Sequence, residues 1–224
     1  MSRIYLSRAS VALFLFAFAA LNQLKADQPN VIVLFADDAG YADFGFQENA
    51  RPDMANLTPR IDSIAEAGAR FTQAYVTAAV CSPSRAGLMT GLYQERFGHE
   101  TNLPPGTQSG LPLSETFGVK RLQEIGYQTG LIGKWHLGYP EAFHPNQRGY
   151  DHFYGLLQGS RSYYPYANPT KDRVIRHNNE FTPESGYITD RLGDSACEFI
   201  EQNKDSPFYL FVSFTAPHGP LEPR

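Results

Sequence analysis

Residues 81–91 read Cys-Ser-Pro-Ser-Arg-Ala-Gly-Leu-Met-Thr-Gly, and they have the features of a short helix that begins beside a reactive side chain. Ser82 is a favourable N-cap residue, and Pro83 suits the first helical position, where a missing N–H group costs nothing. Gly91 lies where a left-handed residue would end such a helix. The stretch therefore predicts a short helix with Cys81 directly before it.

Cys81 and Arg85 together have the chemistry of an anion site. Unpaired N–H groups and the positive dipole end of a helix stabilise a thiolate, a sulfate or a phosphate, and Arg85 can direct its guanidinium to the same anion. A lone cysteine here is also compatible with a buried structural thiol. However, Cys-x-Pro-x-Arg followed by Ala-Gly-Leu-Met-Thr-Gly closely resembles the signature of the type I sulfatases, in the alkaline phosphatase superfamily. The resemblance implies that Cys81 is converted to formylglycine, the hydrated aldehyde being the nucleophile, and that Arg85 stabilises the oxyanion of residue 81.

Upstream of this stretch, residues 31–36 form a continuous apolar run that predicts a strand buried on both faces of an α/β sheet. Asp37 and Asp38 follow it, at the end of a strand where open α/β sheets bind ligands. Two adjacent carboxylates repel each other unless a cation or a proton is shared, although a solvated turn or a helix cap at Asp38 explains them equally well. The segment resembles the N-terminal sulfatase motif, in which both aspartates and the modified cysteine bind a divalent cation, usually calcium.

The rest of the chain alternates between helical and strand patterns. Helices are predicted at residues 58–68, 113–126 and 187–202, and strands at 31–36, 70–76, 127–132 and 208–214. This order predicts an α/β fold. The resemblance implies a central, mostly parallel mixed sheet with helices on both faces, as in the alkaline-phosphatase-like sulfatase fold, in truncated form.

Lys134 and His136 follow the predicted strand at 127–132. In an extended segment they point to the same face, where an ammonium group and an imidazole can bind an oxyanion and move a proton. A salt-bridged lysine and a structural histidine are the alternative. The letters Gly-Lys-Trp-His-Leu-Gly match the second sulfatase hallmark, which implies that Lys134 contacts the aldehyde and sulfate oxygens and that His136 assists breakdown of the covalent intermediate.

His218 lies between two prolines just after the last predicted strand, a simple turn being the alternative. Pro-His-x-Pro resembles the third sulfatase motif, which implies that His218 binds the sulfate and supports departure of the leaving group. Ser160 is the nearest match to a serine that contacts sulfate in some relatives, and the polar loop at residues 161–183 is a candidate for substrate selection. His99, in a polar loop, is predicted to be exposed and receives no role.

Composition and termini restrict the partners. The 224 residues carry a net charge of −4 without a basic stripe, which gives no support to binding of nucleic acid or anionic lipid. Residues 1–26 resemble a signal peptide with cleavage after Ala26, so the mature protein is expected to be secreted or periplasmic, with no membrane association beyond that segment. A Cys81–Cys197 disulfide is the default expectation in that compartment, and a free thiol buried in the helix at 187–202 fits Cys197 as the alternative.

The resemblance covers residues 29–220, so residues 27–224 are expected to be the N-terminal part of a sulfatase catalytic domain that lacks its C-terminal part and the small C-terminal domain. Calcium takes roughly 6–8 oxygen ligands, and no second pair of metal-binding residues can be identified. The implied activity is hydrolysis of an aryl or carbohydrate sulfate ester, after maturation by the formylglycine-generating enzyme. The alternatives are an inactive sulfate- or glycan-binding fragment and a phosphoester hydrolase of the same superfamily.

Overall fold

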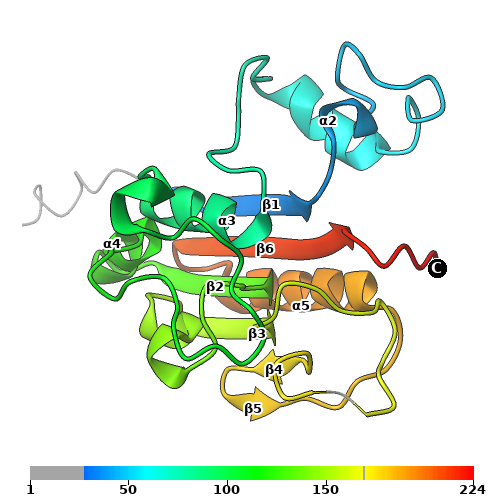
Figure 1. The fold of residues 1–224 in the computed structure, drawn as a ribbon. Helices are drawn as coiled ribbons and strands as arrows, with labels where there is room; N and C mark the ends of the chain where they lie inside the picture. The colour runs from blue at the N-terminus through cyan, green and yellow to red at the C-terminus, as the bar shows by residue number, and fades with distance from the viewer. Residues whose placement is uncertain (1–27, 169) are drawn as a thin grey trace, which may run out of the picture. The chain divides into compact units, whose positions relative to one another are not determined.

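The computed structural model describes residues 28–168 and 170–224 (Figure 1). The helices and strands given below all belong to the second of the chain's two units, residues 31–224. The predicted signal peptide, with its cleavage position after Ala26, lies outside the described residues. Within the described part of the chain, no helix is both long enough and apolar enough to cross a membrane.

A six-stranded sheet with the strand order β1-β6-β2-β3-β4-β5 forms the centre of the second unit (Figure 1). The strands are β1 (Val31–Asp37), β2 (Gln128–Lys134), β3 (His152–Leu156), β4 (Arg176–His177), β5 (Glu180–Phe181) and β6 (Phe208–Pro217). Strands β1, β6, β2 and β3 are parallel, and β4 and β5 add two antiparallel pairings at one edge. The predicted mixed, mostly parallel sheet is therefore confirmed.

Helices cover both faces of the sheet, as predicted. Three helices pack on it: α3 (Cys81–Thr90), α4 (Gly118–Glu124) and α5 (Ile188–Asn203). Helix α2 (Pro59–Ala67) has no buried residue and lies apart from the sheet (Figure 1). The 3-10 turns are η1 (Tyr41–Asp43), η2 (Gln94–Phe97), η3 (Glu141–Phe143) and η4 (Pro145–Gln147). Adjacent residues of β2 pack in different hydrophobic clusters, because the side chains of a strand alternate between the two faces of the sheet. Leu131 packs in a cluster with Ala86 of α3, and Ile132 packs in another with Leu192 of α5.

Strand β1 differs from its prediction, because it lies at the edge of the sheet and one of its faces is open. The side chains of Val33 and Phe35 pack against the core on the α3 side. On the other face, Ile32 and Leu34 remain 45% and 54% exposed. Helix α5 packs against β6, β2 and β3, and so does not cover this part of β1. The expectation of a strand buried on both faces is therefore wrong for the described residues.

Two further elements differ from the sequence pattern. The segment at residues 70–76 is irregular rather than a strand, and Phe71, Tyr75 and Val76 are largely exposed, because no neighbouring strand pairs with it in the described structure. The helix expected from residue 113 begins only at Gly118. Carbonyls before it are bound instead by the buried Arg148 guanidinium, which donates to the backbone oxygens of residues 111, 112 and 115.

Strand direction brings distant parts of the sequence together at one edge of the sheet. The parallel strands β1, β6, β2 and β3 end at Asp37, Pro217, Lys134 and Leu156. Asp37 is level with Pro217 in the β1–β6 pairing. Carboxyl ends of parallel strands are the usual place for ligand sites in α/β proteins. The residues that follow or end these strands therefore share one site.

Candidate active site

Cys81 is the first residue of α3, and Val80, with extended backbone angles, is the N-cap. The prediction of Ser82 as the N-cap is therefore wrong by two positions. The reason is tertiary, since the Ser82 hydroxyl is used elsewhere: its Oγ lies 2.6 Å from the backbone oxygen of His136. The end of the helix is as predicted, because Gly91 is left-handed and its N–H donates to Gly87. Cys81 thus lies in the first turn, where the helix dipole favours negative charge.

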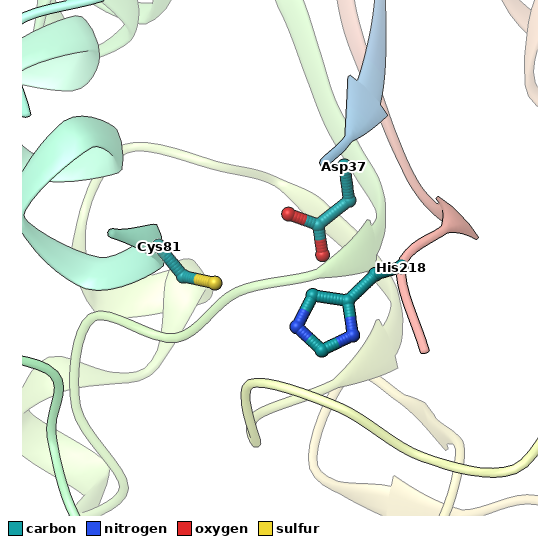
Figure 2. A group of neighbouring side chains, drawn as sticks. All are labelled: Asp37, Cys81 and His218. Atoms are coloured by element: carbon teal, nitrogen blue, oxygen red, sulfur yellow. The ribbon is translucent and has the colours of Figure 1, made fainter. Parts of the chain in front are cut away.

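Three potential ligand atoms meet beside this helix start. One carboxylate oxygen of Asp37, the Sγ of Cys81 and one ring nitrogen of His218 all lie within 4.8 Å of one another. Figure 2 shows the Cys81 sulfur directed toward the space between the Asp37 carboxylate and the His218 ring. The three residues come from the end of β1, the start of α3 and the segment after β6. The structure therefore brings together three of the residues that the sequence selected.

Two buried cations surround the Asp37 carboxylate. The Nζ of Lys134, at the end of β2, donates to Asp37 Oδ2 over 2.5 Å, and an Nη2 of Arg85 lies 3.5 Å from Oδ1. Arg85 also donates to the Lys134 backbone oxygen and to Ser213 Oγ. Burial lowers the pKa of the Arg85 guanidinium, while the neighbouring Asp37 carboxylate raises it. The Asp37 carboxylate thus faces two buried cations at the end of the sheet.

His136 lies at the site, but not for the reason that the sequence suggested. Its φ is +61°, so the extended alternation assumed for Lys134 and His136 does not hold. The ring instead lies against the Leu103 carbonyl, 3.3 Å from its Nε2, and its Nδ1 is buried without a hydrogen-bond partner. Burial lowers the pKa of His136 to about 4, and the positive charge of Lys134 adds to this. The imidazole is therefore neutral at pH 7 and has a free lone pair.

Asp38 and His218 form the outer part of the site. The Asp38 side chain is more than half exposed, and its Oδ2 lies 3.4 Å from His218 Nε2. The other ring nitrogen of His218 lies 2.6 Å from the Gly219 carbonyl. Asp38 has a left-handed φ of +59°, which turns the chain directly after β1 and points its carboxylate to the rim. Asp38 therefore reaches the site through His218, while Asp37 lies within it.

Cys81 borders two hollows. One, of about 350 Å³, is also lined by His136, Ser160 and His218. The other, of about 330 Å³, is lined by the residues of the β1 end and by Arg85. Ser160, the sequence candidate for sulfate contact, thus opens onto the same cavity as Cys81. The cavity is large enough for a small sulfate ester, and its polar groups converge on residue 81.

Both cysteines are free thiols, so the expectation of a Cys81–Cys197 disulfide is contradicted. Cys197 lies in α5 as predicted, but it is exposed rather than buried. The buried residues of this helix include Ala196 and Phe199, and Cys197 falls between them on the outer side. Its neighbours in sequence were apolar, but the helical period turns Cys197 away from the sheet.

The sequence reasoning missed two residues beside Cys81. His99 is only 6% exposed rather than exposed, and its Nε2 lies 2.7 Å from Ser82 Oγ. The Oδ1 of Asn102 accepts a hydrogen bond from the backbone N–H of Ser82. This bond satisfies one of the N–H groups that a helix start leaves unpaired. The sequence offered one indication: His99 and Asn102, two side chains able to hydrogen-bond, lie three residues apart in a loop with no apolar residue between them.

The sheet and the site define an α/β protein with an anion site at the carboxyl ends of its parallel strands. The sulfatase family model matches residues 29–224, and the chain belongs to this family, the type I sulfatases of the alkaline phosphatase superfamily. Arylsulfatase G of Rattus norvegicus is 33% identical over 91% of this chain, which covers 44% of that protein. The uncharacterized sulfatase YdeN of Escherichia coli (strain K12) is 32% identical over 86% of this chain and 41% of its own length.

Solved structures agree with this assignment. The crystal structure of Ps i-CgsB in complex with k-i-k-neocarrahexaose matches with a TM-score of 0.82 and 39% identity, over 88% of this chain and 47% of that one. A sulfatase-fold structure in complex with D-glucosamine-2-N,6-O-disulfate matches with a TM-score of 0.67 and 32% identity, over 88% of this chain and 36% of that one. The chain thus spans less than half the length of these relatives. Members of the family generally use formylglycine and a divalent metal.

Proposed function

We propose that this chain provides the nucleophile and much of the anion-binding surface of an enzyme that hydrolyses sulfate esters. The observation that carries the proposal is the meeting of Cys81, Asp37 and His218 within 4.8 Å, beside the buried cations Lys134 and Arg85. A thiol that lies at a helix start, faces a cavity and has two buried cations nearby is placed for chemistry rather than for packing.

The proposed chemical role of each residue follows from its position in the site. Lys134 and Arg85 hold positive charge where the sulfate oxygens and the oxyanion of residue 81 would lie. His136, which lines the cavity and is neutral with an unpartnered Nδ1, is the candidate proton acceptor. His218, at the rim, can donate from Nε2 when protonated, because its Nδ1 side faces a carbonyl that only accepts. Cys81, His136 and His218 line one cavity, which supports their proposed roles as nucleophile, base and acid.

The residues present fit formylglycine at position 81 and one side of a calcium site. Conversion of Cys81 replaces sulfur by oxygen at a position near the Asp37 carboxylate, and Asp38 offers a second carboxylate at the rim. Asp37, Asp38 and residue 81 would hold the cation, although calcium takes roughly 6–8 oxygens, more than these three side chains supply. When bound, the hydrated aldehyde supplies a nucleophilic hydroxyl and the cation neutralises charge on the sulfate.

We further propose a sulfated carbohydrate as the substrate class, with simple aryl sulfates as test compounds. Support comes from the relatives crystallised with a neocarrahexaose and with a glucosamine disulfate. Maturation requires the formylglycine-generating enzyme as a partner, and residues 1–26 would direct the protein to a secreted or periplasmic location. The loop at residues 161–183, which contains the β4–β5 hairpin, is the proposed source of substrate selection.

The test is co-expression with the formylglycine-generating enzyme, followed by mass analysis and by assays on matched aryl sulfate and aryl phosphate. We expect a loss of about 18 Da from the Cys81 peptide, the difference between a thiol and an aldehyde side chain, and hydrolysis of the sulfate in preference to the phosphate. Cys81→Ala should abolish turnover, whereas Cys197→Ala, at the other free cysteine, should not.

Other results would contradict the proposal. An unmodified Cys81 would refute the assignment of residue 81 as the nucleophile. Modification without turnover, but with saturable sulfate binding, would favour a sulfate- or glycan-binding fragment. A preference for the aryl phosphate would favour a phosphoester hydrolase.

A further inference from the structure

A buried chain of hydrogen bonds links the residue after Cys81 to the backbone of His136. Ser82 Oγ lies 2.7 Å from His99 Nε2 and 2.6 Å from the backbone oxygen of His136. Ser82 and His99 are both buried. The start of α3, which carries residue 81, is thereby joined to the segment after β2, 54 residues away in sequence.

The donors in this chain can be assigned from the acceptors. The His136 carbonyl can only accept, so the Ser82 hydroxyl donates to it. The hydroxyl hydrogen is then committed, and the bond to His99 must be donated by the Nε2–H of that ring. Burial lowers the pKa of His99, which favours a neutral ring. The same loop binds Ser82 a second time, through Asn102 Oδ1.

The loop also holds the His136 ring. Its Nε2 faces the Leu103 carbonyl at 3.3 Å, and since a carbonyl only accepts, the proton of a neutral His136 lies on Nε2. Nδ1 is then the unprotonated nitrogen, and it is buried without a partner. On another side, a Cβ at Gly159 would lie 2.3 Å from His136 Cε1, so the backbone there leaves the ring little room. The ring therefore has one orientation and one tautomer.

We infer that His99 and Ser82 are positioning residues that fix His136 as the Nε2–H tautomer, with an unprotonated Nδ1 that has no hydrogen-bond partner. Neither residue is assigned a contact with substrate. They keep the backbone of His136 in register with the start of α3, and loop 99–103 keeps its ring in place. The inference rests on the proposed function for the meaning of a free Nδ1, but the tautomer is a property of the chain alone.

The experiment uses the full chain in its unconverted thiol form, labelled with 15N in the six histidine rings, at pH 7.5. We expect His136 to show a protonated Nε2 and an unprotonated Nδ1. In Ser82→Ala and His99→Leu, we expect the two nitrogen signals of His136 to move toward each other, as two tautomers exchange. Ser82→Thr keeps the hydroxyl and His99→Gln keeps a donor at the same reach, so both should restore the wild-type pattern.

The matched control is His144→Leu, which removes a histidine equally buried but hydrogen-bonded to Asn146 rather than to the site. Its loss should leave the His136 signals unchanged. A proton on His136 Nδ1 in the wild-type chain would overturn the inference without any variant. So would folded Ser82→Ala and His99→Leu chains with an unchanged His136 pattern, or a His99→Gln chain that behaves like His99→Leu.

The readout separates this inference from the proposed function. No turnover is required, so a chain that fails to hydrolyse sulfate can still confirm the tautomer. Conversely, an active sulfatase with an unrestricted His136 ring would refute the positioning role alone. If Ser82→Ala and His99→Leu do not fold, the wild-type tautomer and the two conservative variants still decide.

Discussion

The Asp37 carboxylate is expected to be essential for stability, because it is the counterion of two cations that have almost no contact with water. Lys134 and Arg85 have side-chain exposures of 0% and 1%, and lie 2.5 and 3.5 Å from the carboxylate oxygens. Removing one partner of a buried ion pair leaves an uncompensated charge, which costs about 3–5 kcal/mol. Asp37→Asn keeps the side-chain shape, so we expect it to lower the free energy of unfolding by about this amount.

A second substitution sharpens the test. In Asp37→Asn/Lys134→Met, one of the two uncompensated cations is gone while the aliphatic stem is kept. We therefore expect the double variant to have a free energy of unfolding at least about 1 kcal/mol higher than that of Asp37→Asn. Two independent destabilising substitutions would instead lower it further, so the increase shows that Asp37 and Lys134 are energetically coupled. The assay is urea unfolding followed by circular dichroism at pH 7, repeated at several protein concentrations.

The matched control is Asp53→Asn. Asp53 pairs with Arg51 at the same distance of 2.5 Å, but both side chains are more than half exposed. Exposed ion pairs contribute little, so no measurable change is expected there. The reasoning would be refuted if Asp37→Asn were as stable as the wild type, or if Lys134→Met made Asp37→Asn still less stable.

The remaining predictions concern histidine, glycine and cysteine positions. Burial lowers the pKa of His136 to about 4, so between about pH 4 and 6.5 the unfolded chain binds a proton at this residue that the folded chain does not. The contribution of His136 to the free energy of unfolding should therefore be fully present above about pH 6.5 and fall by up to about 1.4 kcal/mol per pH unit toward pH 4. His136→Gln should show a shallower decline in acid unfolding curves. Gly159→Ala should destabilise the fold by about 1–3 kcal/mol, since its Cβ would overlap the His136 ring, whereas Gly193→Ala, with free space in α5, should stabilise it by up to about 1 kcal/mol in the same urea assay. Alkylation of the native chain without a reducing agent should modify both cysteines, and a non-reduced mass showing a disulfide would contradict the structure.

Sequence patterns predicted those parts of the fold that depend on local composition. The apolar runs at β2 and β6 and the amphipathic helix α5 lie where periodicity placed them, because burial alone determines such segments. The partner of a segment is not encoded locally, so β1 was expected to be buried on both faces although its edge position leaves Ile32 and Leu34 exposed. The irregular segment at residues 70–76 was mistaken for a strand for the same reason.

The candidate site shows a similar division. Motif letters identified Cys81, Lys134 and His136, which do lie together, but not the backbone that orients them. A φ of +61° at His136 invalidates an argument from strand alternation even though its conclusion, a shared site, remains. His99 was judged exposed because its loop is polar, and only the tertiary contact with Ser82 makes its burial favourable. Such contacts between distant segments leave no periodic trace in the sequence.

The edge position of β1 has a consequence for the behaviour of the chain in solution. In the described structure its outer edge pairs with no strand (Figure 1). One of its faces exposes Ile32 and Leu34. An apolar, unpaired parallel edge is a template on which another chain can add a strand. Association of this chain should therefore increase with its concentration, and a charged residue placed at Leu34 should increase the monomeric fraction.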